Sequence, residues 1–593
     1  MKKSINRNIF WADVLAAQLK KCGLKHICFS PGSRSTPLIF AFSREKYFKT
    51  HLILDERSSA FFALGLAKKL NQPTAVVTTS GTAAAELYPA IVEAYKSRIP
   101  LLIFTADRPA RLRYSGANQT INQINIFANH IRKFYDLGLP GTSINKIRRL
   151  KNITREGFLI ADNLDRGPVH FNCPFEKPFE PDAYTDKIDA ADYKLLLNEN
   201  IKVNQRNTNP IKNVKLWKAV KSSIKNSSKG IIFCGSDFYS DEFSKLCIQL
   251  SQKYNLPIIA DGASNLRFKK HSQKRMVVNA ANFLRTKEIR KKLDAGFIIQ
   301  FGGAPTSKSL LDFFEETSAD IFLVNKYGDI HDPSLSAAGL FKSDYESFCK
   351  KLLSEFKSST VTNIDNNYSE QLLKIDKKVE EIKSAFLNSA AFPFEGKIIN
   401  AAAQTLTSKF NLMVSNSMPI RDLDFFVSGS RAKINLYCSR GASGIDGITS
   451  TAMGIAKAAK VPTVLVTGDL AFFHDLNGLS ISKLLSIPLT IVLINNNGGG
   501  IFEMLPIAEH KNVFTKFFKT PHNLSFQKFV QGFEGVHHQI KSWNDFESGL
   551  LKAVQSKNLT VLEIKTNSTH SLIERKRFWK SVSQTTSSFF DGN

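Results

Sequence analysis

The sequence is poor in cysteine, and the cysteines it has are not paired. Seven cysteines are spread over 593 residues, and none belongs to a CxxC motif. Disulfide-rich secreted domains and structural zinc sites need closely spaced cysteines, and the twelve histidines form no HExxH or similar arrangement either. The sequence therefore predicts a protein of a reducing compartment without a cysteine or histidine metal site.

Apolar runs long enough to cross a membrane are also missing. The longest, such as LTIVLI at 489–494, have the length of a strand, whereas a membrane-spanning helix needs about 20 apolar residues. The N-terminal stretch MKKSINRNIFWADVLAAQLKK is amphipathic, because Asp13 and Gln18 interrupt any apolar core of a signal peptide. We therefore expect a cytoplasmic protein without a membrane span.

Acidic residues are outnumbered by basic ones. The 80 Lys and Arg against 52 Asp and Glu give a net charge of +28, which raises nucleic acid, a membrane surface or anionic small molecules as partners. The basic residues are spread along the chain, however, and no RNP, zinc-finger or basic-helix motif is found among them. A lysine-rich solvated surface is the simpler interpretation, and we expect no nucleic-acid partner.

A repeated pattern links the two ends of the chain. PTAVVTTSGTAAAEL begins at Pro73 and IPLLIFTADRP at Ile99, while PTVLVTGDLAFFHDL begins at Pro462 and IPLTIVLINNNGG at Ile487. The spacing is 26 residues in the first pair and 25 in the second. Each pair has the order strand, small-residue loop, helix and strand that is typical of a parallel sheet.

The middle of the chain contains a third set of short apolar strands, each followed by a glycine-containing loop. They are GIIFCGS at 230–236, LPIIADG at 256–262, AGFIIQFGG at 295–303 and IFLVNKYG at 321–328. Lysine- and asparagine-rich stretches near 186–214 and 355–383 are interpreted as linkers. The patterns predict three α/β domains with doubly wound parallel sheets, at 1–185, 186–355 and 386–593, with a linker at 356–385.

Polar residues follow two strands of the C-terminal unit. Asp469 comes after PTVLVT, and Asn496 comes after LTIVLI. Ligands of open α/β sheets bind beyond the carboxyl ends of the strands, so these residues would converge if the strands are neighbours. Carboxylate and amide oxygens, with the carbonyl of Gly498, suit Mg²⁺, and the glycines let a phosphate approach the backbone. Each part taken alone is also typical of an ordinary turn.

A carboxylate group lies where an apolar strand meets an apolar helix in the N-terminal unit. The stretch ILDERSSAFFALGL at 53–66 places Asp55, Glu56 and Arg57 at this junction. In the local interpretation, Asp55 or Ser58 caps the helix and Glu56 occupies its first turn, where the helix dipole favours it. In the alternative interpretation the carboxylate is functional, and its apolar surroundings favour its protonated form.

The GD pair at 468–469, followed after 27 residues by Asn496, resembles the cofactor-binding motif of thiamine-diphosphate-dependent enzymes. The resemblance implies that the first and last domains share the thiamine-diphosphate-binding fold. One would hold the diphosphate and Mg²⁺ (or Mn²⁺), and the other the aminopyrimidine, with Glu56 bonded to that ring to promote ylid formation. Because the two domains meet across subunits in that family, a homodimer or a dimer of dimers is implied.

Basic side chains also follow the predicted strands. Arg34 belongs to FSPGSRSTPL, Arg108 to TADRP, Arg421 to SNSMPIRDLDFF and Arg440 to SRGASGIDG, while Lys308 belongs to APTSKSLL in the middle domain. Arginine binds carboxylates through two parallel hydrogen bonds, so this set suits substrates with several carboxylates. Loops carry charged residues in any case, and this stays the alternative for each arginine.

One family combines all of these motifs. PGSRSTPL, DER, ADRP…GANQ, SNSMPIRDLD, RGASGIDG and NNNGGGIF, in this order, resemble the 2-succinyl-5-enolpyruvyl-6-hydroxy-3-cyclohexene-1-carboxylate synthases of menaquinone biosynthesis, from about residue 8 to about residue 565. The resemblance implies a transferase that decarboxylates 2-oxoglutarate and adds the succinyl carbanion equivalent to isochorismate in a conjugate fashion. Both substrates are dicarboxylates, which fits the arginines.

The same resemblance implies roles for single residues. Those implied to bind the cofactor are Glu56, Ser443, Gly444, Ile445, Asp469, Leu470, Asn496, Gly498, Ile501 and Phe502, of which Asp469, Asn496 and Gly498 would hold the metal. Those implied to bind substrate are Ser33, Arg34, Arg108, Asn118, Gln119, Lys308, Ser417, Arg421 and Arg440. Ile445 would bend the cofactor into a V shape, and Ile501 and Phe502 would wall the pocket beside its thiazolium ring. Ala471 and Ser309 depart from the family pattern, which often has a serine and a second basic residue there.

Two other functions stay open at this point. Another thiamine-diphosphate carboligase or decarboxylase, similar to acetolactate synthase, would share Glu56 and the Asp469–Asn496 loop but has no need of the arginines. A protein that binds nucleic acid or an anionic membrane through its net charge is the alternative from a different class.

Overall fold

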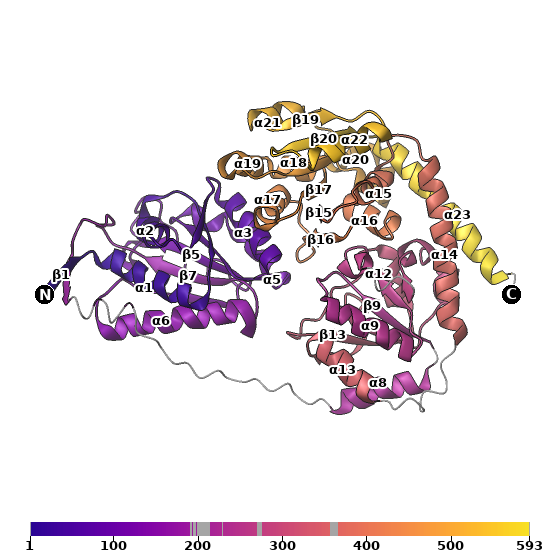
Figure 1. Ribbon diagram of the computed structural model, residues 1–593, viewed down its shortest axis with the longest axis horizontal. Coiled ribbons are helices and arrows are strands. Elements are labelled where there is room, and N and C mark those ends of the chain that lie inside the picture. Colours follow the sequence, from indigo (N-terminus) through magenta and orange to yellow (C-terminus); the bar gives the residue numbers. More distant parts are fainter. Residues whose placement is uncertain are drawn as a thin grey trace.

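The fold consists of three α/β units, which the computed structural model describes over residues 2–189, 193, 197, 214–227, 229–269, 275–355 and 366–591. Each unit has a six-stranded sheet, and β1 (Lys2–Ile5) pairs with β8 (Asp186–Asp189) in a small antiparallel sheet. In Figure 1 the N-terminal unit lies at the left, the middle unit at the lower right and the C-terminal unit at the top. Within these residues, none of the helices has both the length and the apolar character that crossing a membrane requires.

The N-terminal sheet has the order β3-β2-β4-β5-β7-β6, with parallel strands throughout. Its strands are β2 (His26–Phe29), β3 (Lys49–Leu52), β4 (Thr74–Thr78), β5 (Leu101–Asp107), β6 (Lys133–Asp136) and β7 (Val169–Pro174). Strands β4 and β5 are buried at every residue, as expected for central parallel strands covered on both faces. One face packs on α1 (Arg7–Cys22), α2 (Thr36–Arg44) and α6 (Ile144–Leu159), and the other on α3 (Glu56–Leu70) and α5 (Tyr88–Lys96).

The C-terminal sheet repeats this topology. Its order is β16-β15-β17-β18-β20-β19, and strands numbered by their place in each unit give 2-1-3-4-6-5 in both terminal sheets. The strands are β15 (Phe410–Val414), β16 (Ile434–Cys438), β17 (Thr463–Gly468), β18 (Thr490–Asn495), β19 (Val536–Gln539) and β20 (Thr560–Lys565). One face packs on α15 (Glu395–Thr405), α16 (Met418–Phe426) and α22 (Trp543–Ala553), and the other on α17 (Ile448–Ala458).

The middle sheet has a different topology, β11-β10-β9-β12-β13-β14, which is 3-2-1-4-5-6 by the same numbering. This is the strand order of dinucleotide-binding folds, but fold alone does not assign a ligand. The strands are β9 (Gly230–Cys234), β10 (Ile258–Ala260), β11 (Met276–Val277), β12 (Phe297–Phe301), β13 (Asp320–Asn325) and β14 (Ala337–Lys342). Its helices include α8 (Val214–Asn226), α9 (Asp241–Lys253), α12 (Lys308–Glu316) and α13 (Tyr345–Glu355).

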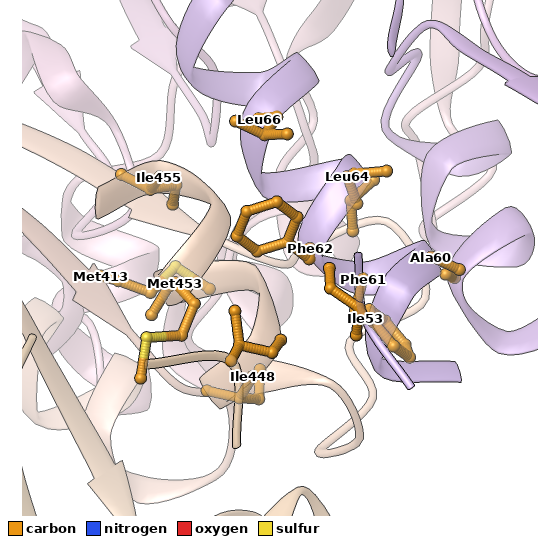
Figure 2. Close-up of a cluster of buried hydrophobic side chains, with 14 of the residues drawn as sticks. Ile53, Ala60, Phe61, Phe62, Leu64, Leu66, Met413, Ile448, Met453 and Ile455 are labelled. Atoms are coloured by element: carbon orange, nitrogen blue, oxygen red, sulfur yellow. The ribbon is translucent and has the colours of Figure 1, made fainter. Parts of the chain in front are cut away.

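Helices α3 and α17 pack against each other and join the two terminal units. Figure 2 shows Phe61 and Phe62 of α3 facing Ile448 and Met453 of α17, and all four side chains are buried in one apolar cluster. The helices approach closely because glycines face the partner backbone. A Cβ added to Gly65 would lie 2.1 Å from the carbonyl oxygen of Thr451, and one added to Gly454 would lie 2.1 Å from the carbonyl oxygen of Phe62. The cluster thus continues from one sheet to the other.

Two long helices connect the C-terminal unit with the middle unit. Helix α14 (Asn366–Ser389) and helix α23 (Ser568–Asp591) lie side by side in Figure 1 and contact each other. Ile375 of α14 and Phe578 of α23 belong to one apolar cluster with Ile298 of the middle sheet. Shorter helices are α4 (Thr82–Ala85), α10 (Ala280–Phe283), α11 (Lys287–Lys292), α18 (Asp469–His474), α19 (Ser480–Leu485), α20 (Lys511–Phe514) and α21 (Phe526–Gly532).

The predicted fold class is confirmed, since three parallel sheets are present and the first and last share one topology. The domain boundaries stay a prediction. Helix α14 occupies residues 366–385 of the predicted linker, whereas residues 356–365 and most of the stretch 186–214 lie outside the described residues.

Candidate functional site

One cavity lies at the carboxyl ends of neighbouring strands in the C-terminal sheet. The loops after β15, β16, β17 and β18 all contribute to it, because parallel neighbours end at the same edge of a sheet. Eight of the predicted site residues line this cavity: Ser417, Ile445, Asp469, Leu470, Asn496, Gly498, Ile501 and Phe502. The structure therefore brings the predicted metal ligands and the predicted apolar wall together in one place.

Asp469 is held by backbone and side-chain donors from two later loops. Its Oδ2 accepts a hydrogen bond of 2.9 Å from the N–H of Gly498 and lies 3.2 Å from Nε2 of His522. Its Oδ1 accepts a hydrogen bond of 2.7 Å from the N–H of Leu470. Burial raises the pKa of Asp469, although these hydrogen bonds lower it in part. Asp469 is therefore a carboxylate in a fixed position, and a nearby cation would stabilise its ionised form.

Asn496 presents an amide oxygen without a partner. Its Nδ2 donates a hydrogen bond of 3.0 Å to Oε1 of Glu395, while its Oδ1 is buried and has no hydrogen-bond partner among the described residues. The backbone at Gly498 has a φ of +140°, and an added Cβ would lie 2.0 Å from the carbonyl oxygen of Lys519. An unpaired amide oxygen beside a buried carboxylate fits Mg²⁺, which takes oxygen ligands from both groups.

Two guanidinium groups lie near this cavity without a carboxylate partner. Arg421 donates to the carbonyl oxygen of Ser417 at 2.8 Å, and Arg440 donates to Oδ1 of Asn416 at 3.1 Å. In the described part of the chain, neither forms an ion pair within 4.0 Å. Burial lowers the pKa of Arg421, and the charge of Arg440 lowers it further. Two adjacent, partly buried cations are suited to bind an anion.

Asn416 fixes the loop between β16 and α17 through two hydrogen bonds. Its Nδ2 donates to the carbonyl oxygens of Ser439 at 2.8 Å and Gly444 at 2.7 Å. The predicted cofactor residues Ser443 and Gly444 precede Ile445, which lines the cavity. Ser443 and the cavity residue Ser417 both have positive φ angles, of 60° and 73°. Such backbone strain in residues other than glycine is concentrated at functional sites.

Glu56 is the first residue of α3, and its neighbour Asp55 caps that helix. Oδ1 of Asp55 accepts a hydrogen bond of 2.7 Å from the N–H of Ser58, so capping does not need Glu56. Burial raises the pKa of Glu56, and Asp55 and Glu86 raise it too. Asp55 accepts from Asn477 at 2.9 Å, and thereby holds this helix start against the C-terminal unit. Glu56 is not among the residues that line the cavity of its own chain.

The predicted substrate residues of the N-terminal unit follow β2 and β5 and form a second group, which contacts Ser80 after β4. Arg108 donates to Oγ of Ser80 and to the carbonyl oxygen of Gln119, whose side chain donates to the carbonyl oxygen of Ser80 at 3.1 Å. Burial lowers the pKa of Arg34, and the charge of Arg108 lowers it further. Ser33 and Asn118 are exposed in the same loops. None of this group lines the cavity of the C-terminal unit.

Lys308 lies apart from both groups. It is the first residue of α12 in the middle unit, its side chain is 76% exposed, and it forms an ion pair with Asp312 one turn later. This pair raises the pKa of Lys308. The structure does not bring Lys308 into the cavity lining.

Several lining residues were not predicted from the sequence. Glu395, Asn416 and Asp422 all line the cavity and are buried. Asn416 and Asp422 are next to predicted residues in SNSMPIRDLD, so the motif itself held a signal for them. Glu395 has the position of an ordinary first-turn glutamate and gave no such signal.

A second cavity lies at the opposite, amino ends of β17 and β18. Its lining combines Lys457, Lys460 and four serine or threonine residues with apolar ones, and none of the predicted site residues belongs to it. Because ligands of α/β sheets bind at the carboxyl ends of strands, the first cavity is the stronger candidate.

The sequence matches the three domain families of thiamine pyrophosphate enzymes. Residues 11–126 match the N-terminal thiamine pyrophosphate binding domain, residues 200–414 the middle domain, and residues 431–564 the C-terminal thiamine pyrophosphate binding domain. The first and third of these contain the two terminal sheets for the most part, in agreement with the repeated topology.

Relatives of similar length carry one name, 2-succinyl-5-enolpyruvyl-6-hydroxy-3-cyclohexene-1-carboxylate synthase. The protein of Oceanobacillus iheyensis is 35% identical over 96% of this chain and 96% of its own length. That of Bacillus cytotoxicus is 35% identical over 98% of both chains, and that of Trichodesmium erythraeum 36% identical over 94% of this chain and 96% of its own. A solved structure, benzoylformate decarboxylase from Polynucleobacter necessarius, has the same fold, with a TM-score of 0.69 and 14% identity over 94% of this chain and 98% of that one.

Proposed function

The chain belongs to the family of thiamine-diphosphate-dependent 2-succinyl-5-enolpyruvyl-6-hydroxy-3-cyclohexene-1-carboxylate synthases, and from this we propose how its residues share the work. The reaction is the decarboxylation of 2-oxoglutarate and the addition of the remaining four-carbon unit to isochorismate, a transferase step of menaquinone biosynthesis. Bound thiamine diphosphate supplies the electron sink for this chemistry. The protein supplies binding, orientation and proton exchange.

Asp469, Asn496 and the carbonyl oxygen of Gly498 would hold Mg²⁺ or Mn²⁺ together with the diphosphate. The fixed carboxylate of Asp469 and the unpaired Oδ1 of Asn496 support this assignment. Gly498 accepts one hydrogen bond from Gly500, at 3.0 Å, and a carbonyl oxygen has a second lone pair for the metal. Leu470, Ile445, Ile501 and Phe502 would enclose the organic part of the cofactor, with Ser443 and Gly444 beside it.

Glu56 would exchange a proton with the aminopyrimidine ring in a neighbouring subunit. The raised pKa of this carboxyl group suits proton exchange, and Asp55 rather than Glu56 does the capping. Because Glu56 does not line the cavity of its own chain, we propose a homodimer, or a dimer of dimers, in which each cavity receives the glutamate of the partner.

The two groups of basic residues would bind the carboxylates of the two substrates. Ser417 lines the cavity, and Arg421 and Arg440 donate hydrogen bonds to the lining residues Ser417 and Asn416. Across the same subunit contact as Glu56, the second group would reach the cavity: Arg34, Arg108 and Gln119, with Ser33 and Asn118 in their loops. Lys308 would have to leave Asp312 to take part. We propose that the protein acts in the cytoplasm on small molecules and has no nucleic-acid partner. The cytoplasmic location fits its seven cysteines, which are all free thiols.

The observation that carries the proposal is the unpaired amide oxygen of Asn496 in the same cavity as Asp469. The test is to measure carbon dioxide release from 2-oxoglutarate with thiamine diphosphate and Mg²⁺, with and without isochorismate, while isochorismate loss is followed in parallel. We expect coupled loss of both substrates. Turnover of pyruvate without use of 2-oxoglutarate would instead indicate an enzyme similar to acetolactate synthase.

A further inference from the structure

Glu395 is a buried carboxylate that lines the cavity and fixes the orientation of Asn496. It is the first residue of α15, and its Oε1 accepts hydrogen bonds from Nδ2 of Asn496 at 3.0 Å and from Oγ1 of Thr566 at 2.9 Å. An ionised carboxylate only accepts hydrogen bonds, so it can face only the NH₂ end of the asparagine amide. The oxygen end of Asn496 is therefore turned away from Glu395.

The second oxygen of Glu395 is held by an arginine from the C-terminal helix. Arg575 of α23 donates to Oε2 of Glu395 at 2.9 Å, and also donates to both oxygens of Asp422 at 2.9 and 2.6 Å. The three side chains are only 3%, 2% and 1% exposed, respectively. Burial alone would lower the pKa of Arg575, but Asp422 and Glu395 together outweigh it and raise this pKa, so the group between them is a cation.

We propose that Glu395, held in place by Arg575, is a positioning residue that sets the affinity of the site for its metal ion. It does so by keeping Oδ1 of Asn496 toward the cavity, where a cation needs an oxygen. The inference rests on the proposed function, because it takes Asn496 as a metal ligand. Such outer residues typically change metal affinity by about 10- to 100-fold when they are replaced.

The variant Glu395→Gln tests the orientation with almost no change of shape. A glutamine has one oxygen and one NH₂ group, and an NH₂ group facing the Arg575 cation would place donor against donor in a buried site. The glutamine would therefore turn its oxygen to Arg575 and its NH₂ group to Asn496. Asn496 would then turn its own oxygen toward residue 395 and away from the cavity.

Asp422→Asn is the matched control. Asp422 bonds to the same arginine and is as deeply buried, but it has no hydrogen bond to Asn496 among those of the described residues. Both variants remove one negative charge beside Arg575. Asp422→Asn also sets an NH₂ group against a guanidinium N–H, because Arg575 donates to both oxygens of Asp422, so it controls for disturbance of Arg575 as well as for loss of charge. If Glu395 only stabilised the fold, the two variants would therefore lose stability and metal affinity to a similar extent.

The experiment is a titration of Mn²⁺ into the full-length protein saturated with thiamine diphosphate, with free Mn²⁺ followed by electron paramagnetic resonance. We expect Glu395→Gln to bind Mn²⁺ about 10- to 100-fold more weakly than the unsubstituted protein, and Asp422→Asn to stay within about threefold. Equal affinities for Glu395→Gln and the unsubstituted protein, or equal losses in both variants, would overturn the proposal.

Two further measurements keep the outcome decisive. If Glu395→Gln does not fold, Glu395→Asp replaces it, since this variant keeps the charge beside Arg575 but is too short to reach Asn496 as well. It should show the same weakened Mn²⁺ binding, and unchanged binding would count against the proposal. Absence of Mn²⁺ binding by the unsubstituted protein would contradict the proposed function itself, which separates that failure from this one.

Discussion

The carboxylate of Glu93 in α5 accepts hydrogen bonds from the backbone N–H groups of Gly441, at 3.1 Å, and Ala442, at 2.7 Å. Glu93 belongs to the N-terminal unit and is 4% exposed. The loop it holds belongs to the C-terminal unit and contains Arg440 and Ile445. One buried side chain thus fixes the position of a loop in which we propose that Ile445 contacts the cofactor and Arg440 the substrate.

Replacement of Glu93 by Gln should therefore weaken both the fold and the site. A glutamine presents one oxygen where the loop needs two acceptors, and the lost buried hydrogen bond should cost about 1–3 kcal/mol in the free energy of unfolding. Urea unfolding measures this, with Glu534→Gln on the surface as a control that should change by less than about 0.5 kcal/mol. Similar small effects of both substitutions would show that the loop does not depend on Glu93.

The close approach of α3 and α17 predicts a large effect of a single methyl group. In Gly65→Ala the new Cβ would meet the backbone of Thr451, which cannot move aside, so we expect a loss of about 1–3 kcal/mol or more in stability. Gly532→Ala in α21 is the matched control, because no atom lies within 4 Å of its added Cβ. It should be neutral or slightly stabilising in the same urea unfolding experiment.

Asp55 and Glu56 are adjacent carboxylates for which we expect opposite effects. Asp55→Ala removes the helix cap and should cost about 1 kcal/mol of stability while most turnover is retained. Glu56→Gln should leave the unfolding curve unchanged but lower kcat by about 10²- to 10⁴-fold, because proton exchange with the cofactor is lost. Near-normal turnover of Glu56→Gln would contradict this role and show that Glu56 is an ordinary first-turn glutamate.

Arg421→Ala should damage substrate use rather than cofactor binding. Arg421 forms no ion pair with a carboxylate in the described structure, and the buried neighbour Asp422 keeps its ion pair with Arg575, so removal of Arg421 leaves no buried carboxylate unpaired. We expect kcat/KM for 2-oxoglutarate or isochorismate to fall at least tenfold, about 1.4 kcal/mol, with thiamine diphosphate affinity unchanged. A clear loss of cofactor affinity in a titration would show that Arg421 serves the diphosphate instead.

Asp475 should make stability depend on pH. Burial raises its pKa to about 7, although the N–H and hydroxyl groups of Ser450 donate to it at 2.7 and 3.0 Å. The folded chain holds this proton up to about pH 7 and the unfolded chain releases it near pH 4, so the contribution of Asp475 is full below about pH 4 and falls as the pH rises to 7.

The variant Asp475→Asn can keep both contacts to Ser450, because its oxygen accepts and its NH₂ group donates. We expect its free energy of unfolding to decrease less than that of the unsubstituted protein between about pH 4 and about pH 8. Urea unfolding at several pH values tests this, and parallel curves for the two proteins would contradict the assignment.

The sequence was sufficient for features that depend on local pattern. Apolar strands followed by glycine or polar loops predicted three parallel sheets, and the spacing of Asp469 and Asn496 predicted two residues that line one cavity. The resemblance implied that the two terminal sheets share one fold, but the strand order itself, 2-1-3-4-6-5, could not be deduced, because it is decided by packing between distant segments. Glu395 was missed for a similar reason, since its partner Arg575 lies 180 residues further along the chain.

Because Arg575 is synthesised late, we expect it to influence when the C-terminal unit folds during synthesis. This cation is translated 153 residues after Asp422 and 180 residues after Glu395, which is roughly 10–40 s at ribosomal speed. During that time the nascent chain holds two carboxylates destined for an apolar interior, with no counter-charge to accompany them. We therefore expect the helices that carry Glu395 and Asp422 to pack on the C-terminal sheet only after Arg575 has left the ribosome, whereas the N-terminal unit can fold earlier.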